Sequence, residues 1–218
     1  LIVAHEVTNV GSDRSQLANM ALQAKEAIAC EELAVVADRG YFSGEEILSC
    51  EQADITAYVP KTQTSNNQAR GLFGRRDFIY RADDNAYECP AGERLSYRFT
   101  TQDKGKTVHR YWSSACPRCR LKKQCTTAVY RRVKRWEHEA VMEAMEDRVD
   151  RMPDCMRIRG STVEHPFGTI KSWMGPVHFL MRRLEHVSTE MSLHVLSYNL
   201  KRMLQMFGVG PLIAAIRG

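Results

Sequence analysis

The chain has 218 residues, of which 44% are hydrophobic and 26% charged, and its formal net charge is +5. A chain of this length and composition can bury a substantial core, which excludes an intrinsically disordered protein. No apolar run approaches the roughly 18 residues of a membrane span and no signal peptide opens the chain, so we expect a cytoplasmic protein without a membrane partner.

Residues 1–60 alternate between strand and helix patterns. Apolar runs predict strands over 1–7, 33–37 and 55–59, and Ser12-Asp13 and Ser43-Gly44 are typical helix starts, the first for a helix over 14–30. Strands and helices at this spacing predict a largely parallel sheet in an α/β fold. Because the chain enters a strand directly at Leu1 and lacks an initial Met, we expect a fragment of a longer protein.

The middle of the chain is strongly basic. Between Lys61 and Trp136 there are 18 Lys or Arg against 6 Asp or Glu, although the remainder is mildly acidic. Such a block favours a polyanionic partner, with a solvated basic surface as the alternative. It contains only short strand-like stretches, over 78–81 and 94–100, and is too long for a plain loop, so we expect an inserted subdomain.

Helical spacing returns after this block, over 136–149, 161–173 and 188–207. The last helix has an apolar stripe that predicts core packing. The stripe consists of Leu193, Leu196, Leu200, Met203, Leu204 and Phe207. We therefore expect residues 1–60 and 136–218 to form one core and residues 61–135 to form a basic, cysteine-rich insertion.

Asp38 directly follows the strand predicted over 33–37, and Gly40 allows a sharp turn behind it. Ligands bind at the carboxyl ends of parallel strands, so Asp38 is a candidate catalytic acid. The structural alternative is an Asp that bonds backbone amides in a strand-to-helix turn.

Glu164 is a second candidate acid, on a distant helix. The alternative is a capping box, because Ser161 precedes Glu164 by three residues, although Pro166 is awkward so early in a helix. Lys171 lies two turns further on the same face and is placed to contact a phosphate. Two carboxylates from separate elements can hold two divalent ions about 4 Å apart, an arrangement that cleaves phosphodiesters.

Four of the seven cysteines lie in the basic block: Cys89, Cys116, Cys119 and Cys125. The Cys116-Pro117-Arg118-Cys119 segment has the spacing of half a zinc site, and the other two thiols complete a ligand set. His109 is an alternative ligand, and four unliganded thiols are the structural alternative. Such a site would present basic side chains to DNA backbone, with Tyr111 and Trp112 beside them; these are Arg118, Arg120, Lys122 and Lys123.

Two segments resemble the second and third catalytic blocks of bacterial insertion-sequence transposases of the DDE type. They are Ala37-Asp38-Arg39-Gly40-Tyr41 and the run from Glu164 to Lys171. The segments Trp173-Met174-Gly175, His178-Phe179-Leu180 and Tyr198-Asn199-Leu200-Lys201-Arg202 resemble the end of those proteins, and a four-cysteine insertion between the acids is also similar.

The resemblance implies an RNase H-like α/β fold, with a mixed sheet flanked by helices and a helical C-terminus. It implies two Asp and one Glu that bind Mg²⁺ or Mn²⁺ and that cut and join DNA. On this pattern Asp38 is the second acid and Glu164 the third. Lys171 matches a lysine that contacts DNA, and Arg159 resembles an arginine that precedes the glutamate and is likewise expected to contact DNA. Met156 or Arg157 stands where a tyrosine is common.

The first Asp of the pattern is not matched. It belongs to the first strand of the fold, and residues 1–7 would be the third, so we expect it upstream of Leu1 together with the missing strands. Asp13 is the one early acid that is a candidate substitute. With two of three acids, the fragment is expected to be inactive alone.

The leading functional hypothesis is a transposase fragment that acts on element ends and target DNA, in a homodimer when full-length and associated with the bacterial nucleoid. The alternative is a non-catalytic, zinc-stabilised DNA-binding remnant of a transposase. A third hypothesis, a junction-resolving nuclease of the same fold, is disfavoured by the tail motifs and the cysteines.

Overall fold

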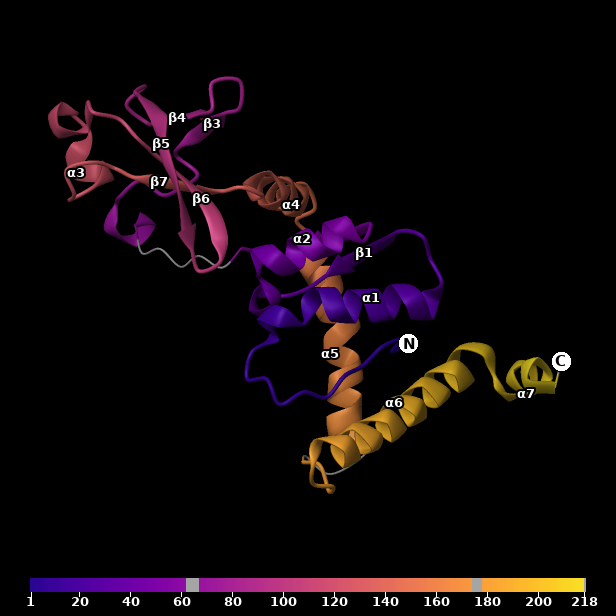
Figure 1. The fold of residues 1–218 in the computed structure, drawn as a ribbon. Helices are drawn as coiled ribbons and strands as arrows, with labels where there is room; N and C mark the ends of the chain where they lie inside the picture. Colours follow the sequence, from indigo (N-terminus) through magenta and orange to yellow (C-terminus); the bar gives the residue numbers. More distant parts are fainter. Residues whose placement is uncertain (62–66, 174–177, 218) are drawn as a thin grey trace. The chain divides into compact units, whose positions relative to one another are not determined.

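The computed structural model describes residues 1–61, 67–173 and 178–217 (Figure 1). It divides the chain into two compact units. The first unit comprises Leu1–Lys61 and Val141–Gly218, and the second comprises Thr62–Ala140. That the second unit is an insertion into a catalytic core remains a prediction.

The sheet of the first unit is a parallel pair of strands. β1 (Leu33–Val36) pairs with β2 (Ile55–Tyr58), so that Val36 lies opposite Tyr58. Parallel neighbours require a crossover, and α2 (Gly44–Gln52) provides it. The helix α1 (Leu17–Ile28) packs against α2 and β1. This arrangement confirms the strand–helix–strand pattern over 33–59.

Four helices form the C-terminal part of the chain (Figure 1). They are α4 (Glu139–Arg151), α5 (Cys155–Trp173), α6 (Leu184–Phe207) and α7 (Val209–Arg217). α5 contacts both β1 and α6, and therefore connects the sheet to the C-terminal helices. Met145 on α4 and Cys155 on α5 are fully buried, with Ile47 on α2 and Ile55 on β2.

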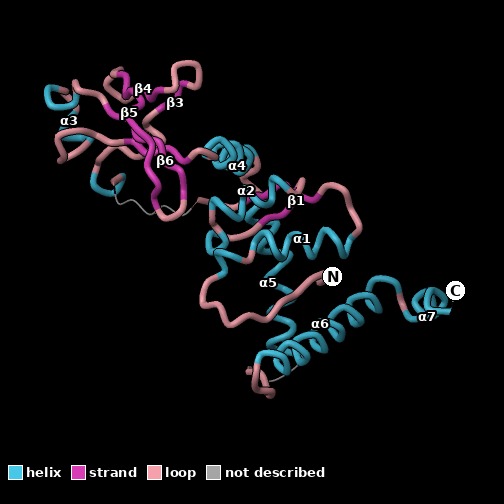
Figure 2. The backbone as a smooth tube through the Cα atoms, in the orientation of Figure 1, coloured by secondary structure: helices cyan, strands magenta, loops and turns pink. Residues whose placement is uncertain are grey.

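The second unit is built on a five-stranded antiparallel sheet in the order β3-β4-β5-β6-β7 (Figure 2). The strands are β3 (Ile79–Arg81), β4 (Ala86–Glu88), β5 (Arg94–Asp103), β6 (Lys106–Trp112) and β7 (Val133–Trp136). Its core consists of Phe78, Tyr87, Leu95, Tyr111 and Val133. The rings of Tyr87 and Tyr111 meet edge to face with their centroids 5.1 Å apart, a favourable geometry for aromatic pairs. The predicted strand-like stretches over 78–81 and 94–100 are confirmed as β3 and β5.

The strand predicted over residues 1–7 is not formed. This segment has no regular secondary structure, and its polar contacts are with α6 and, through Glu6, with Asn19 and Gln23 of α1. The Ile2 amide donates to Asn199 Oδ1 at 2.8 Å, and Asn199 Nδ2 donates to the Ile2 carbonyl at 2.7 Å. Because one side-chain amide satisfies both backbone groups of Ile2, this residue does not need a strand partner.

The apolar stripe predicted to pack in the core from α6 is largely exposed. Leu196 is 62% exposed and Leu193 56% exposed. The buried positions of this helix lie on another face, at Glu190, Val195 and Tyr198. The prediction was wrong because periodicity identifies an apolar face but not whether a neighbouring element covers it.

The fold is mixed α/β, with helices flanking its sheets, as the sequence predicted. Among the described residues, no helix combines the length and the apolar character that a bilayer crossing requires.

The burial pattern predicts how two substitutions of similar size change stability. Ile47→Ala should lower the free energy of unfolding by about 2–5 kcal/mol, because it opens a cavity at a fully buried position. Leu196→Ala removes an exposed side chain and should change it by about 0.5 kcal/mol or less. Urea unfolding followed by circular dichroism measures both, and a large loss in Leu196→Ala would contradict the exposed face of α6.

Candidate active site and cysteine cavity

Asp38 lies just beyond the carboxyl end of β1, where the chain turns into the short 3₁₀ helix η2 (Arg39–Tyr41). Its Oδ1 accepts the Gly40 amide at 2.8 Å, so it caps this turn as the structural alternative expected. The side chain nevertheless remains 42% exposed, and its Oδ2 faces away from the turn toward a second partner. Capping therefore uses only one of the two carboxylate oxygens.

The second partner of Asp38 is Arg159, which comes from the second turn of α5. Arg159 Nη2 donates to Asp38 Oδ2 at 2.9 Å, joining residues that are 121 positions apart. Arg159 was expected to contact DNA, and in this structure its guanidinium is directed at the candidate acid. The contact places α5 at the carboxyl end of β1.

Asp13 lies close to the same turn. A Cβ added to Gly40 would be 3.0 Å from Asp38 Oδ1 and 4.0 Å from Asp13 Oδ2. Burial raises the pKa of the Tyr41 hydroxyl, the negative charges of Asp13 and Asp38 raise it further, and Arg159 opposes them. Two carboxylates, one guanidinium and one phenol therefore share this region.

Glu164 lies within α5, and the capping-box alternative is wrong. The helix begins at Cys155, and the Ser161 and Thr162 hydroxyls both donate to the Ile158 carbonyl inside it. Glu164 lies on an exposed face of this helix. Its carboxylate has no hydrogen bond or ion pair to another described residue. Its Oε1 lies 3.7 Å from where a Gly160 Cβ would stand, so the side chain extends back toward the turn that contains Arg159.

Lys171 is exposed near the end of α5, two turns beyond Glu164. Met174 and Gly175, which belong to the first tail motif of the family resemblance, lie outside the described residues. In the described ranges, no three histidine, cysteine or acidic side chains form a ready-made metal group. Asp38, Asp13 and Glu164 are therefore not assembled as a metal centre by themselves.

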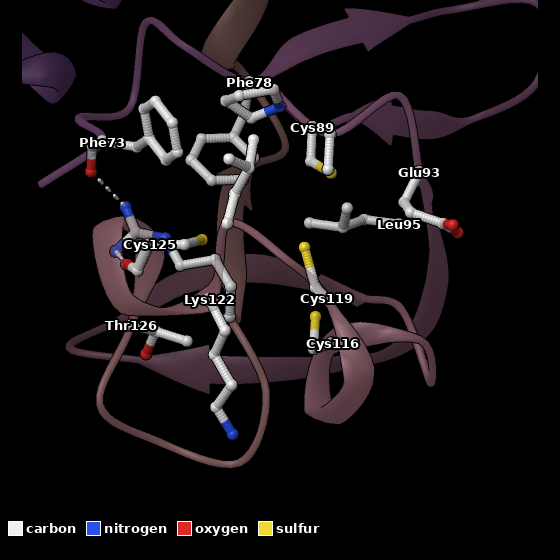
Figure 3. Close-up of a pocket in the computed structure, with 14 residues that line it drawn as sticks. Phe73, Phe78, Cys89, Glu93, Leu95, Cys116, Cys119, Lys122, Cys125 and Thr126 are labelled. Atoms are coloured by element: carbon white, nitrogen blue, oxygen red, sulfur yellow. Dashed lines mark hydrogen bonds between the residues drawn. The ribbon is translucent and has the colours of Figure 1, made fainter.

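The four cysteines of the second unit line one cavity (Figure 3). Cys89 begins the β4–β5 turn, Cys116 and Cys119 come from the turn at η4 (Cys116–Arg118), and Cys125 comes from the short helix α3 (Lys122–Cys125). All four are free thiols. Burial raises the pKa of Cys125, the nearby Arg131 lowers it, and the other three thiols raise it.

The alternative ligand His109 does not line this cavity. Its Nδ1 bonds to Thr100 Oγ1 at 2.8 Å, and its ring packs against Tyr97. Tyr111, expected on the surface, is instead 1% exposed in the core, where Tyr111 Oη donates to Asn85 Oδ1 at 2.8 Å. Tyr111 lies in β6 between Arg110 and Trp112, and the sequence does not show which face of this strand is covered by the core.

The four basic residues expected to contact DNA lie on the segment that contains Cys116, Cys119 and Cys125. Arg118, Arg120 and Lys123 are exposed, whereas Lys122 is half-buried and its side chain lines the cysteine cavity. Trp112 lies between two arginines, with Arg98 at 5.3 Å and Arg132 at 5.5 Å from its ring centroid.

A family model described as "Transposase DDE domain" matches residues 88–204, more than half of the chain. The chain belongs to this DDE transposase family. No curated protein and no solved structure matches the chain significantly. The family match includes Glu164 and the four cysteines of the cavity, whereas Asp38 lies outside it.

Membership of the DDE transposase family gives the chain a transposase-type function on DNA, in a family of polynucleotidyl transferases. These enzymes generally use a divalent metal such as Mg²⁺. The mixed α/β fold is compatible with an RNase H-like DDE domain.

The sequence did not predict the structural role of Glu190, which holds the segment before α6 by accepting its backbone amides. Its carboxylate accepts the amides of Leu180, at 3.0 Å, and Met181, at 2.9 Å, and these bonds lower the pKa of Glu190. The sequence gives no signal for this role, because it depends on how Leu180 and Met181 fold back onto α6.

The ion pair between Arg159 and Asp38 predicts how Arg159 affects metal binding. Arg159→Ala should bind Mn²⁺ about fivefold more tightly, because it frees a half-exposed carboxylate from a pair worth about 1 kcal/mol. Titration calorimetry measures the affinity. Arg157→Ala is the matched control, because Arg157 lies on the same helix, is exposed and pairs only with Asp154 among the described residues. Weaker Mn²⁺ binding by Arg159→Ala would show that Arg159 positions Asp38 for the metal.

Proposed function

We propose that the chain is the part of a transposase that supplies the second and third metal-binding acids, Asp38 and Glu164, for DNA strand cleavage and strand transfer. One observation supports this assignment above the others. Arg159, one and a half turns before Glu164 on α5, bonds directly to Asp38 at the end of β1. The two acids therefore belong to elements that meet.

The orientation of Glu164 supports the same site. Its carboxylate extends over Gly160, the residue that follows Arg159, and so lies at the level of α5 that faces the Asp38 turn. The Arg159 guanidinium occupies Asp38 Oδ2, the carboxylate oxygen that the turn leaves free. A metal ion that binds Asp38 would take the place of this cation.

The chemistry of the donors fits Mg²⁺ or Mn²⁺. Carboxylate oxygens are hard ligands that suit these ions, and both Asp38 and Glu164 are accessible from solvent. The bound ions would activate a water or a DNA 3′-hydroxyl and stabilise the leaving oxygen. Asp38 keeps one oxygen on the Gly40 amide, which fixes the direction of the other.

The first acid has two candidate positions. It is either upstream of Leu1, as the family pattern expects, or Asp13, whose carboxylate lies near that of Asp38. Lys171 and the basic residues of the second unit would contact DNA backbone. Because two element ends must be brought together, we expect a homodimer of the full-length protein.

A specific observation favours the alternative function, a non-catalytic DNA-binding remnant. The one candidate acid at the end of β1 is already paired with an arginine, and the described residues contain no assembled metal group. A remnant would keep DNA binding and lose cleavage.

Cleavage of element-end DNA in Mg²⁺ separates these functions. In a chain extended upstream of Leu1, Asp38→Asn and Glu164→Gln should each lower nicking by about a hundredfold or more, because each removes a metal ligand. Glu26→Gln, an exposed acid on α1, is the control and should leave the rate unchanged. Asp13→Asn shows whether Asp13 or an upstream acid is the first ligand.

Cleavage that survives in Asp38→Asn would exclude the assignment of Asp38. An extended wild type that binds DNA but does not nick it would establish the remnant.

The DNA-binding prediction concerns the second unit. The double variant Arg118→Ala, Arg120→Ala should bind duplex DNA more weakly at every sequence and reduce the slope of log K against log salt by about two. Fluorescence anisotropy at several salt concentrations measures this slope. The control Lys104→Asn removes an exposed charge from the β5–β6 turn and keeps the left-handed backbone that Asn tolerates. Equal slopes in the double variant and the wild type would remove these arginines from the interface.

A further inference from the structure

We propose that the cysteine cavity of the second unit is a structural zinc site with four thiolate ligands: Cys89, Cys116, Cys119 and Cys125. These residues come from three separate segments, yet all four line one small cavity (Figure 3). The proposal is independent of the cleavage site, which lies in the first unit.

The size of the cavity suits a single ion. Its free volume is about 20 Å³, a little more than one water molecule needs and far less than an organic ligand occupies. The surrounding side chains are mainly apolar, with Phe78 and Leu95 of the core among them. A bare water would find few partners there, whereas a metal ion has four sulfur ligands available.

The local backbone holds two of the ligand segments in tight turns. The Gly92 amide donates to the Cys89 carbonyl at 2.8 Å, and the Cys89 amide donates to the Glu93 carbonyl at 3.0 Å. Gly92 has φ +77°, a conformation that side chains rarely adopt. The Cys119 amide donates to the Cys116 carbonyl at 3.3 Å, so the second turn is closed as well.

The charge around the cavity also fits. Four thiolates and one Zn²⁺ leave two net negative charges. Arg131 lines the cavity, donates to the Cys125 carbonyl at 3.4 Å and to the Phe73 carbonyl at 3.3 Å, and has a buried Nε without a described partner. A buried guanidinium beside a tetrathiolate centre compensates part of its charge.

Ligand chemistry selects the metal. Tetrahedral thiolate sets favour zinc or iron over Mg²⁺ or Ca²⁺, and the Cys-x2-Cys spacing of Cys116 and Cys119 is typical of structural zinc sites. The thiols surround the cavity without standing at ligand distances, since no ready-made metal group occurs in the described residues. Rotation about χ1 moves a cysteine sulfur between staggered positions without moving the backbone, and this is the adjustment that we propose the ion requires.

A bound zinc ion would cross-link two segments of the second unit. The ion would tie the β4–β5 turn to the segment 116–125, which contains Arg118, Arg120 and Lys123. Zinc would therefore hold the basic side chains in place without taking part in strand cleavage.

The test is the metal content of the purified chain, measured by inductively coupled plasma mass spectrometry. We expect about one zinc per chain in the wild type. Cys116→Ser and Cys119→Ser should each lower it at least fivefold. The matched control is Cys30→Ser, a half-buried thiol outside the cavity, which should keep its zinc. Less than a tenth of an equivalent in the wild type, iron in place of zinc, or unchanged zinc in both variants would overturn the proposal.

A second measurement covers the case that the variants do not fold. Chelation of zinc from the wild type should lower its thermal midpoint, and added Zn²⁺ should restore it where added Mg²⁺ does not. Thiol titration of the native chain should show four fewer reactive cysteines when zinc is bound than after chelation. Cys50 and Cys155 are fully buried and should not react in either state. A midpoint that chelation leaves unchanged would count against the site. These readouts do not depend on nicking, so they stand even if the cleavage assignment fails.

Discussion

The contact between Arg159 and Asp38 is the interaction on which the candidate active site depends. It joins the carboxyl end of β1 to the second turn of α5 at 2.9 Å, across 121 positions of sequence. Without it, Asp38 would be only the cap of a short turn and Glu164 an exposed acid on a helix surface. The pair is half-exposed, so it contributes little to stability. Its importance is geometric, because it brings the segment containing Glu164 to the sheet edge where Asp38 ends the strand.

The two units organise charge in different ways. In the first unit, the Arg159 guanidinium pairs with the Asp38 carboxylate, and Asp13 lies beside the same turn. In the second unit, aromatic rings fill the core, and two exposed arginines, Arg98 and Arg132, lie over the ring of Trp112. Guanidinium groups held over aromatic faces lose less conformational entropy when they bind a phosphate than freely mobile side chains do. The basic surface is therefore partly preorganised for a polyanion.

Much of this fold was predictable from local pattern. The βαβ unit over 33–58, the strands β3 and β5 and the helices α4, α5 and α6 follow from periodicity and turn chemistry, as does the position of Asp38 after β1. The strands β4, β6 and β7 and the helix α7 were not predicted, because their patterns are short. Two failures share one cause. Residues 1–7 have a strand pattern but bond to Asn199, and α6 has an apolar stripe that remains exposed, because a sequence pattern does not show which element packs against a face. The sequence also could not show that Arg159 contacts Asp38, which depends on long-range packing. Ligand spacing indicated only the pair Cys116 and Cys119, whereas Cys89 and Cys125 stand at irregular spacing.

The exposed face of α6 and α7 has a practical consequence for work with this chain. Leu196, Phe207 and Ile216 are 62%, 55% and 83% exposed, while the other unit is rich in lysine and arginine. Raising the ionic strength screens the basic surface and loosens adhering nucleic acid. Strongly excluded salts such as sulfate simultaneously favour self-association of the leucine-rich helices. The choice of anion therefore governs purification: chloride releases bound nucleic acid without favouring association of the exposed helices, whereas ammonium sulfate releases nucleic acid and also promotes that association.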